Sequence, residues 1–173
     1  RLIGENTDGI GLLNSIRTQM ALDVEGLRVV IVGAGGAARS VALTMVENGA
    51  TVGIYNRTHS SAAQVVEIVG GTSSVVQQNA IRDAELIINA TPLGMAPNDP
   101  MPFDADLLRD DQSIVDLIYE PAKTTLLKEA DSRGLRTLNG LGMLLHQAGE
   151  QFRLWTGQQP PIEAMAESVG LTV

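Results

Sequence analysis

The chain contains no cysteine and only two histidines among its 173 residues. Disulfide bonds and thiolate metal sites are therefore excluded, and the lack of cysteine is compatible with the reducing cytoplasm, where we expect the protein to act. The two histidines, His59 and His146, lie far apart, and neither belongs to a metal-binding pattern. We therefore expect no metal site.

The chain also lacks a basic block and a long apolar run. Its formal net charge is −8, which argues against nucleic acid or an anionic membrane as a general partner, because any phosphate binding would have to be local. No apolar stretch approaches the roughly 20 residues of a membrane-spanning helix. Hydrophobic residues make up 44% and charged residues 18% of the chain, so we expect one folded domain with a substantial core.

A strand, a glycine-rich turn and a helix follow one another between residues 27 and 47. The β-branched run 29–32 is typical of a strand buried on both faces of a parallel sheet. The turn after it consists of Gly33, Ala34, Gly35, Gly36 and Ala37. Gly33 permits the turn, Gly35 lets the backbone approach a pyrophosphate, and the helix N-terminus offers free N–H groups. The pattern predicts a dinucleotide site; the alternative is an ordinary strand-to-helix turn.

The predicted second strand, residues 51–55, ends in Asn56, Arg57 and Thr58. In NAD-binding versions of this arrangement, an acidic residue at this place binds the ribose diol. No carboxylate lies between residues 55 and 61, whereas an arginine pairs with a 2′-phosphate and a threonine hydroxyl can donate to it. We therefore predict NADP rather than NAD as the cofactor; the alternative is a solvated surface arginine.

Strand and helix patterns alternate along the rest of the chain. Further strands are predicted at 73–76, 85–89, 113–117 and 135–138, and helices at 10–22, 59–69, 123–133, 143–155 and 162–169. This alternation predicts an α/β fold, a Rossmann-like doubly wound, mostly parallel sheet with helices on both faces. Asn89 and Thr91 follow a strand at its carboxyl end, where ligands of such sheets bind, so we predict that both face the cofactor. The alternative for both is turn chemistry.

Six stretches of the chain, in this order, resemble the shikimate dehydrogenase family. They are Asn6-Thr7-Asp8-Gly9, Gly33-x-Gly35-Gly36-Ala37, Asn56-Arg57-Thr58, Asn89-Ala90-Thr91-Pro92-x-Gly94-Met95, Asp116-x-x-Tyr119-x-Pro121 and Gly140-Leu141-x-Met143-Leu144-x-x-Gln147. The resemblance extends over nearly the whole chain. It implies an oxidoreductase of aromatic amino-acid biosynthesis that reduces 3-dehydroshikimate to shikimate with NADPH.

The resemblance also implies where the cofactor lies. It places the pyrophosphate on residues 33–37 and the 2′-phosphate on residues 56–58. It places the nicotinamide beside Leu117 and Gly140. The family often has a second basic residue just past the Asn-Arg-Thr stretch, whereas this chain has Ser61. The resemblance therefore implies a weaker clamp on the 2′-phosphate and a softer selectivity for NADP.

For the substrate, the resemblance implies contacts from Asp8, Tyr119 and Gln147 to hydroxyl groups. It also pairs Asp8 with a catalytic lysine, although on the residues alone Asp8 is equally well explained as the N-cap of a helix. Neither Lys123 nor Lys128 stands in the family's lysine motif. That lysine belongs to a substrate domain that precedes the cofactor domain in the family.

We therefore expect residues 1–173 to be the NADP-binding domain of a longer enzyme. Residues of about 1–8 and 143–173 are expected to bridge to the preceding substrate domain, with part of their apolar surface uncovered here. Two other functions stay open: a paralogue that acts on quinate, and a nucleotide-binding module without catalysis. A small-molecule substrate is the expected partner in the first two cases.

Overall fold

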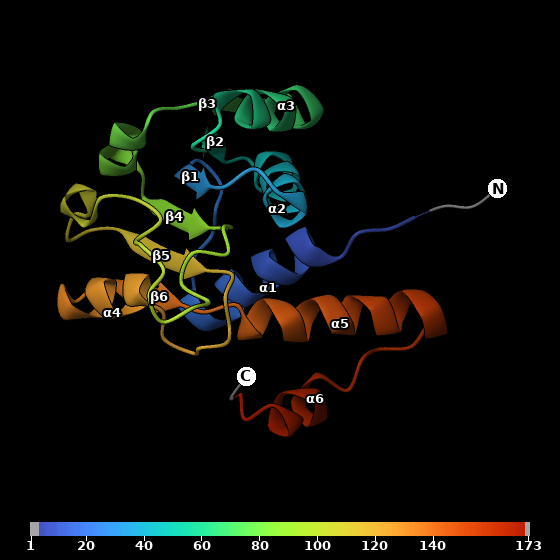
Figure 1. Cartoon of the computed structure of the whole chain (residues 1–173). Helices are drawn as coiled ribbons and strands as arrows, with labels where there is room; N and C mark the ends of the chain where they lie inside the picture. The colour runs from blue at the N-terminus through green and yellow to red at the C-terminus, as the bar shows by residue number, and fades with distance from the viewer. Residues whose placement is uncertain (1–3, 172–173) are drawn as a thin grey trace.

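The computed structural model describes residues 4–171 of the chain, and strands and helices alternate along them (Figure 1). The helices are α1 (Asp8–Met20), α2 (Gly36–Glu47), α3 (His59–Val69), α4 (Thr125–Ser132), α5 (Leu141–Thr156) and α6 (Ile162–Ser168). The strands are β1 (Arg28–Val32), β2 (Thr51–Tyr55), β3 (Ser73–Val75), β4 (Leu86–Asn89), β5 (Ser113–Asp116) and β6 (Arg136–Leu138). Two 3₁₀ turns, η1 (Gln78–Asp83) and η2 (Ala105–Leu107), lie within the connections.

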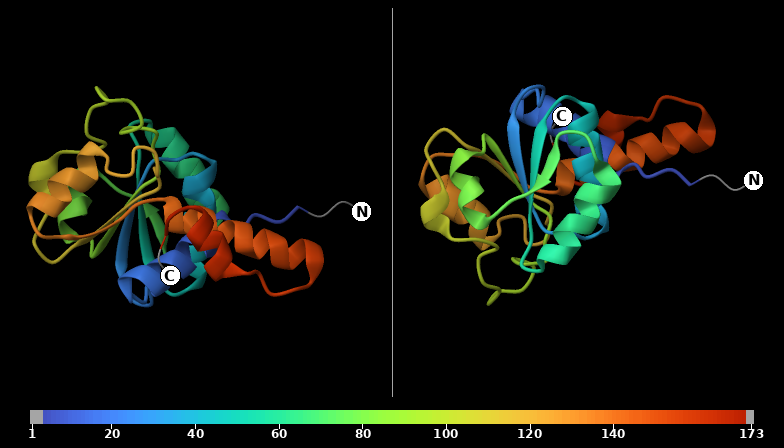
Figure 2. Two further views of the ribbon diagram at one scale, coloured as in Figure 1. Left: turned by 90° about the horizontal axis from the view of Figure 1, so that it is seen from below. Right: turned by 90° about the horizontal axis from the view of Figure 1, so that it is seen from above.

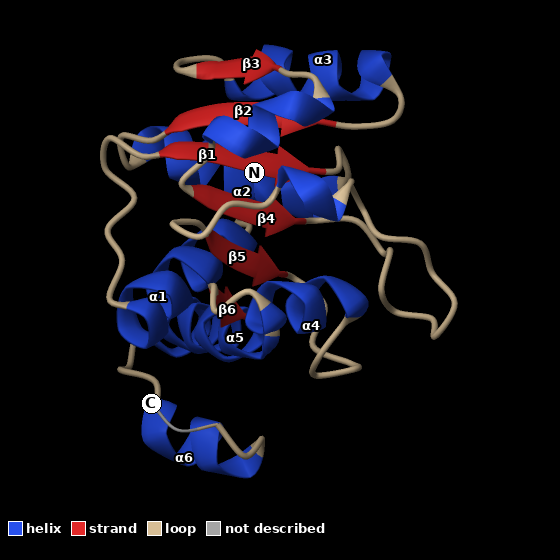
Figure 3. Ribbon diagram, turned by 90° about the vertical axis from the view of Figure 1, so that its left-hand side faces the viewer, coloured by secondary structure: helices blue, strands red, loops and turns tan. Residues whose placement is uncertain are grey.

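The strands form one six-stranded parallel sheet in the order β3-β2-β1-β4-β5-β6 (Figure 3). The chain starts in the middle of the sheet, builds one half outward through β2 and β3, and returns to β4 to build the other half. This is the strand order of the doubly wound dinucleotide-binding fold. The predicted fold class is confirmed, and every pair of neighbouring strands is parallel rather than most of them.

Alternate side chains of the central strands enter two separate cores. In β1, Val29 and Ile31 pack toward one face of the sheet, and Val30 and Val32 pack toward the other. Because both faces are covered, the strand reads as an unbroken apolar run rather than an alternating one. Helices lie on both sides of the sheet in end-on view (Figure 2).

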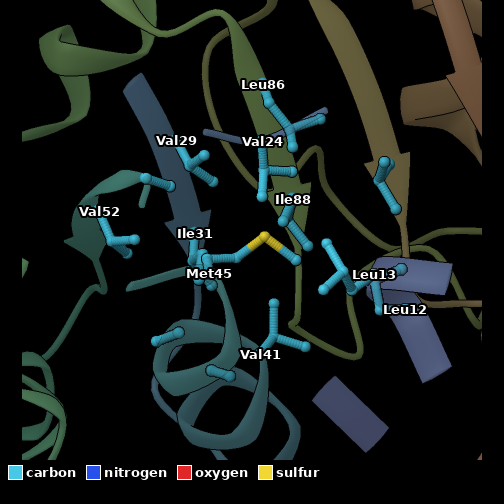
Figure 4. Packing of buried hydrophobic residues seen from close by; sticks show 14 of the residues in the cluster. Leu12, Leu13, Val24, Val29, Ile31, Val41, Met45, Val52, Leu86 and Ile88 are labelled. Atoms are coloured by element: carbon cyan, nitrogen blue, oxygen red, sulfur yellow. The ribbon is translucent and has the colours of Figure 1, made fainter. Parts of the chain in front are cut away.

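The larger core lies between the sheet and the helices α1, α2, α3 and α5. Figure 4 shows the side chain of Met45 from α2 beside Ile31 of β1 and Ile88 of β4. All three side chains are fully buried, and each buried side chain of this size contributes about 1.5–3 kcal/mol. This packing fixes the start of α2 relative to the ends of β1 and β4.

Helices α1 and α5 approach each other closely enough to exclude side chains at two places. A Cβ on Gly11 of α1 would lie 2.7 Å from the backbone nitrogen of Gln147 in α5. A Cβ on Gly142 of α5 would overlap the side chains of Ser15 and Gln19 in α1. The start of α1 is therefore held against the middle of α5.

Most predicted boundaries agree with the structure to within two residues, and two differences have a clear cause. Helix α4 begins at Thr125 rather than at residue 123, because Thr124 is its N-cap and accepts a hydrogen bond from the Leu127 amide at 3.3 Å. Strand β5 ends at Asp116 rather than at residue 117, because the Asp116 side chain turns to accept the Ile118 amide.

The end of α5 carries uncovered apolar surface. The helix continues past the sheet, and α6 lies alongside it (Figure 1). Trp155 is 79% exposed and Leu154 is 45% exposed, as expected for part of a segment that bridges to another domain. The bridging role itself remains a prediction, and residues 1–3 and 172–173 lie outside the described residues. Within residues 4–171, no helix is long and apolar enough to cross a membrane.

Candidate functional site

The carboxyl ends of all six parallel strands lie at one edge of the sheet. Strands β1 and β4 are neighbours there, although β2 and β3 lie between them in the sequence. Loops that leave this pair of strands turn to opposite sides, so a crevice opens between them. The predicted glycine turn follows β1, and Asn89 and Thr91 follow β4, so both predicted regions lie at one crevice.

Gly33 makes the turn after β1 possible. Its φ of 115° lies in a region that residues with a Cβ rarely adopt. A Cβ there would also lie 2.8 Å from the carbonyl oxygen of Ala90. The Gly33 amide donates a 2.8 Å hydrogen bond to the carbonyl of Tyr55. Gly33 thus sets the direction of the turn between the ends of β2 and β4.

Gly35 and Gly36 leave open space in front of α2. A Cβ on either residue would have no described protein atom within 4 Å, and both residues are exposed. Gly35 is the N-cap of α2, and it offers no side-chain cap to the first amides of that helix. These amides and the helix dipole point into the open space and suit an anion. The residues present therefore fit a pyrophosphate.

A cleft of about 700 Å³ extends from the glycine turn toward the end of β2. Its lining includes Gly33, Asn56, Arg57 and Thr91, together with an apolar wall from residues 100–103 and the adjoining Asp104. Arg57 is exposed, and it forms no ion pair with any residue of the described chain. The cleft thus joins the glycine turn, an unpaired guanidinium and an apolar wall, which suits an adenosine with a 2′-phosphate.

Asn56 and Thr58 shape the turn that carries Arg57. The Asn56 Nδ2 donates to the carbonyl of Thr58 at 2.9 Å. Thr58 is the N-cap of α3, but its side chain makes no cap hydrogen bond. Its hydroxyl and the first turn of α3 therefore lie beside Arg57 at an uncapped helix N-terminus, which favours an anion.

A second cavity, of about 320 Å³, lies on the other side of Thr91. Its lining includes Ala37 at the start of α2, Leu117, and Tyr119, which is 48% exposed. Gly140 packs its backbone directly on the carbonyl of Leu117, so that a Cβ on Gly140 would overlap it. The structure brings Leu117, Tyr119 and Gly140 together, and Thr91 borders both cavities.

Asn89 does not face either cavity, which corrects the prediction for this residue. Its side chain is fully buried. Its Oδ1 accepts hydrogen bonds from the Thr91 amide at 3.1 Å and from the Thr91 hydroxyl at 2.7 Å. The alternative of turn chemistry holds, because these bonds shape the loop after β4. The burial of a strand end cannot be read from the sequence.

Asp116 is a buried carboxylate that sequence reasoning did not assign to the site. It is fully buried and accepts hydrogen bonds from Thr124 Oγ1 at 2.7 Å, Asn89 Nδ2 at 3.0 Å and the Ile118 amide at 3.2 Å. Burial raises the pKa of Asp116 above its ordinary value, and these three donors oppose that shift. The signal was present in the sequence, because Asn89 and Asp116 both end apolar strands.

We expect Asp116→Asn to gain stability relative to the original chain as pH rises. Because the folded state raises the pKa of Asp116, the stability tied to this group is complete below the ordinary aspartate pKa of about 3.9. It is lost as pH rises through the raised pKa of the folded state. Denaturant titrations of both chains between about pH 4 and pH 7 measure the difference. A difference that stays constant with pH would contradict the burial of an ionisable group here.

Asp8 lies at the start of α1, but it is not the N-cap. Thr7 occupies the N-cap position, and its side chain makes no cap hydrogen bond. Instead, Asn6 Oδ1 accepts the Asp8 amide at 2.8 Å and the Ser40 hydroxyl at 2.8 Å. Ser40 Oγ in turn accepts the amide of Gly9 at 2.9 Å. The alternative explanation of Asp8 is therefore wrong, and its carboxylate is not used in capping.

Gln147 lies close to the start of α1 through a cluster of polar side chains. Thr7 Oγ1 donates to Gln147 Oε1 at 3.4 Å, and Gln151 Nε2 donates to both Gln147 Oε1 at 2.6 Å and Thr7 Oγ1 at 3.2 Å. Gln147 is thereby held next to the residue before Asp8. The predicted substrate residues Asp8 and Gln147 are brought to one place, with Thr7 and Gln151 as supports that sequence reasoning missed.

Two family profiles match this sequence. Residues 15–94 match the family described as shikimate / quinate 5-dehydrogenase, and residues 140–169 match the shikimate 5′-dehydrogenase C-terminal domain. A shikimate dehydrogenase (NADP(+)) from Methanosarcina barkeri is 40% identical over 176 residues, and the alignment covers 96% of this chain and 62% of that protein.

Two solved structures share the fold over nearly the whole chain. A shikimate dehydrogenase from Thermus thermophilus, in complex with NADP(H) and shikimate, has a TM-score of 0.87 and 37% identity, and the match covers 98% of this chain and 64% of that one. A quinate dehydrogenase from Corynebacterium glutamicum, in complex with NAD, has a TM-score of 0.87 and 32% identity, and the match covers 96% and 62%. The chain thus spans about 62% of the length of the curated relatives that it matches.

Proposed function

The chain belongs to the shikimate dehydrogenase family, and from that premise we propose that it is the NADP-binding part of an enzyme that reduces 3-dehydroshikimate to shikimate with NADPH. The observation that carries the proposal is the crevice at the ends of β1, β2 and β4. An open, uncapped helix start and an unpaired Arg57 both border that crevice. The helix start suits a pyrophosphate, and Arg57 suits the 2′-phosphate of the adenosine. We further propose that the enzyme acts in the cytoplasm.

Each end of the cofactor has a matching part of the site. The pyrophosphate lies over residues 33–37, and the adenosine and its 2′-phosphate occupy the cleft of about 700 Å³ beside residues 56–58. The nicotinamide occupies the cavity of about 320 Å³, with Leu117 on its wall and Gly140 behind that residue. Selectivity for NADP over NAD rests on Arg57, because Ser61 adds no second positive charge.

The bound cofactor supplies the hydride in this reaction. The residues of this chain bind and orient the substrate. Asp8 accepts a hydrogen bond from a substrate hydroxyl and orients the lysine ammonium that gives a proton to the nascent alkoxide. Gln147 and Tyr119 hold further hydroxyls. Gln147 is held by Thr7, the residue before Asp8, and the loop of Tyr119 is tied to the start of α5 by the hydrogen bond from the Gly140 amide to the Ile118 carbonyl.

The lysine comes from a preceding substrate domain, and the segments near residues 1–8 and 143–173 connect the two domains. Of the lysines in this chain, Lys123 pairs with Asp131 and lies 60% exposed. Lys128 lies with it at a neighbouring pocket, which shares Met95 and Glu120 with the cavity of Tyr119, but neither lysine lines that cavity itself. The proposal therefore assigns the proton transfer to a residue outside the 173-residue chain.

We expect the 173-residue chain to show no oxidation of shikimate by NADP⁺ above the blank, because the proton-transferring lysine is absent from it. The measurement is NADPH formation at 340 nm, with an intact shikimate dehydrogenase as the positive control. Turnover by the chain alone would contradict the placement of the lysine. Cofactor binding is measured separately, so a silent assay does not by itself decide the cofactor.

A second candidate substrate is quinate. The likeness to a quinate dehydrogenase that was solved with NAD favours it, since Tyr119 and Gln147 suit the hydroxyls of either ring. Kinetics of the intact enzyme with shikimate and quinate side by side decide between them. A higher kcat/KM for quinate would replace shikimate in the proposal and would leave the cofactor site unchanged. A module without catalysis is favoured only if the intact protein turns over neither compound.

A further inference from the structure

Asp116 and Asn89 face each other across the sheet at the carboxyl edge. They occupy paired positions at the ends of β5 and β4, and both side chains are fully buried. The Asn89 amide donates to Asp116 Oδ1 at 3.0 Å, and the Thr124 hydroxyl donates to Asp116 Oδ2 at 2.7 Å. The carboxylate therefore joins two strands to the N-cap of α4.

The same side chains reach into the two loops that leave these strands. Asp116 Oδ1 also accepts the Ile118 amide, in the loop after β5. Asn89 accepts the amide and the hydroxyl of Thr91, in the loop after β4, and donates to the Leu93 carbonyl at 3.3 Å. One continuous set of hydrogen bonds thus crosses from one loop to the other beneath the crevice.

These two loops form the wall of the smaller cavity. Thr91 and Ile118 line it, whereas Asn89, Asp116 and Thr124 do not. A buried carboxylate costs free energy even when it is well bonded, and an apolar pair of the same volume is often no less stable. Asp116 is also too far inside to contact a substrate. Its hydrogen bonds fix the two loops and the N-cap of α4 relative to one another.

We propose that Asp116 is a positioning residue for the nicotinamide half of the cofactor, an inference that rests on the proposed function. Asp116 acts by holding the loops of Thr91 and Ile118 at a fixed separation. The larger adenosine cleft depends on it much less. That cleft is bounded by Gly33, residues 55–57 and the loop 100–104, and of the residues in this network only Thr91 and Leu93 border it. Loss of Asp116 leaves the bonds between Asn89 and Thr91 in place.

The test compares two ligands on the 173-residue chain by calorimetry: NADP⁺ and 2′-phospho-ADP-ribose, which lacks the nicotinamide. Asp116→Ala removes the shared acceptor of three donors, and we expect it to weaken NADP⁺ binding about tenfold. It should leave the affinity for 2′-phospho-ADP-ribose within about twofold. Asp116→Asn keeps an acceptor for Asn89 and Ile118 and can donate to Thr124, so it should restore NADP⁺ binding to within about threefold.

Two further variants separate positioning from loss of stability. Gln112→Ala removes another buried side chain, whose amide donates to the carbonyls of Ile81 and Ala84 at the opposite edge of the sheet. It should lower stability and change neither affinity. If Asp116→Ala does not fold, Thr124→Val removes both the donor to Asp116 Oδ2 and the N-cap acceptor of α4, and it should weaken the binding of NADP⁺ alone.

The outcomes are distinct. The positioning role is overturned if the Asp116→Ala or Thr124→Val chain loses affinity equally for both ligands, or loses affinity for neither. An original chain that binds neither ligand overturns the proposed function instead.

Discussion

Arg57→Ala should weaken the binding of NADPH by about 10- to 150-fold. A hydrogen bond to a charged group contributes about 1.5–3 kcal/mol, and each 1.4 kcal/mol corresponds to about a factor of ten in affinity. Arg57 is exposed at the cleft and has no ion pair within the described residues, so its removal breaks no internal contact of that kind. NADH lacks the 2′-phosphate, and its affinity should barely change.

Arg82→Ala is the matched control for this experiment. Arg82 is also exposed, but it lies at the end of η1, on the side of the sheet where β4 begins. The control removes one positive charge at a place outside the cleft, so the affinities for both cofactors should stay unchanged. If Arg57→Ala weakened NADPH and NADH equally, Arg57 would have no specific contact with the 2′-phosphate.

Gly35→Ala should fold normally and lose affinity for NADPH and NADH alike, by at least about tenfold. Its φ of −82° is accessible to alanine, and the new Cβ would have no described protein atom within 4 Å. The methyl group would instead occupy the space in front of the first amides of α2, where charge-assisted bonds to a pyrophosphate form. Melting temperature and calorimetric affinity, measured on the same sample, give the two results separately.

Gly4→Ala serves as the control, because Gly4 is exposed and its Cβ would also meet open space. Gly33 is unsuitable for this experiment, since its φ of 115° and the nearby Ala90 carbonyl would disturb the fold itself. Unchanged binding of both cofactors by Gly35→Ala would mean that no pyrophosphate lies over this turn.

The doubly wound sheet was predictable because its causes are local. A β-branched run such as 29–32 is typical of a strand buried on both faces, and the glycines that follow it favour a sharp turn into a helix. The strand at 51–55 and the helix at 59–69 were predicted with the bounds that the structure has. The arrangement of Gly33 and Arg57 at one crevice then follows from the parallel order of the strands.

The errors concern contacts that depend on the packing of distant segments. Asn89 was expected at the cofactor, but it lies under the loop after β4 because its bonding partners are Asp116 and Thr91. Asp8 was considered as an N-cap, whereas Asn6 supplies that acceptor. Polar residues at strand ends have the same sequence pattern whether they point into a crevice or beneath it, so sequence alone does not separate the two cases.

The central claim is that one crevice binds a dinucleotide and distinguishes its 2′-phosphate. Calorimetric titration of the original chain with NADPH and, in a second cell, with NADH tests this most directly. We expect one NADPH to bind per chain, with a higher affinity than NADH. Binding of neither nucleotide, or NADH binding at least as tight as NADPH binding, would contradict it.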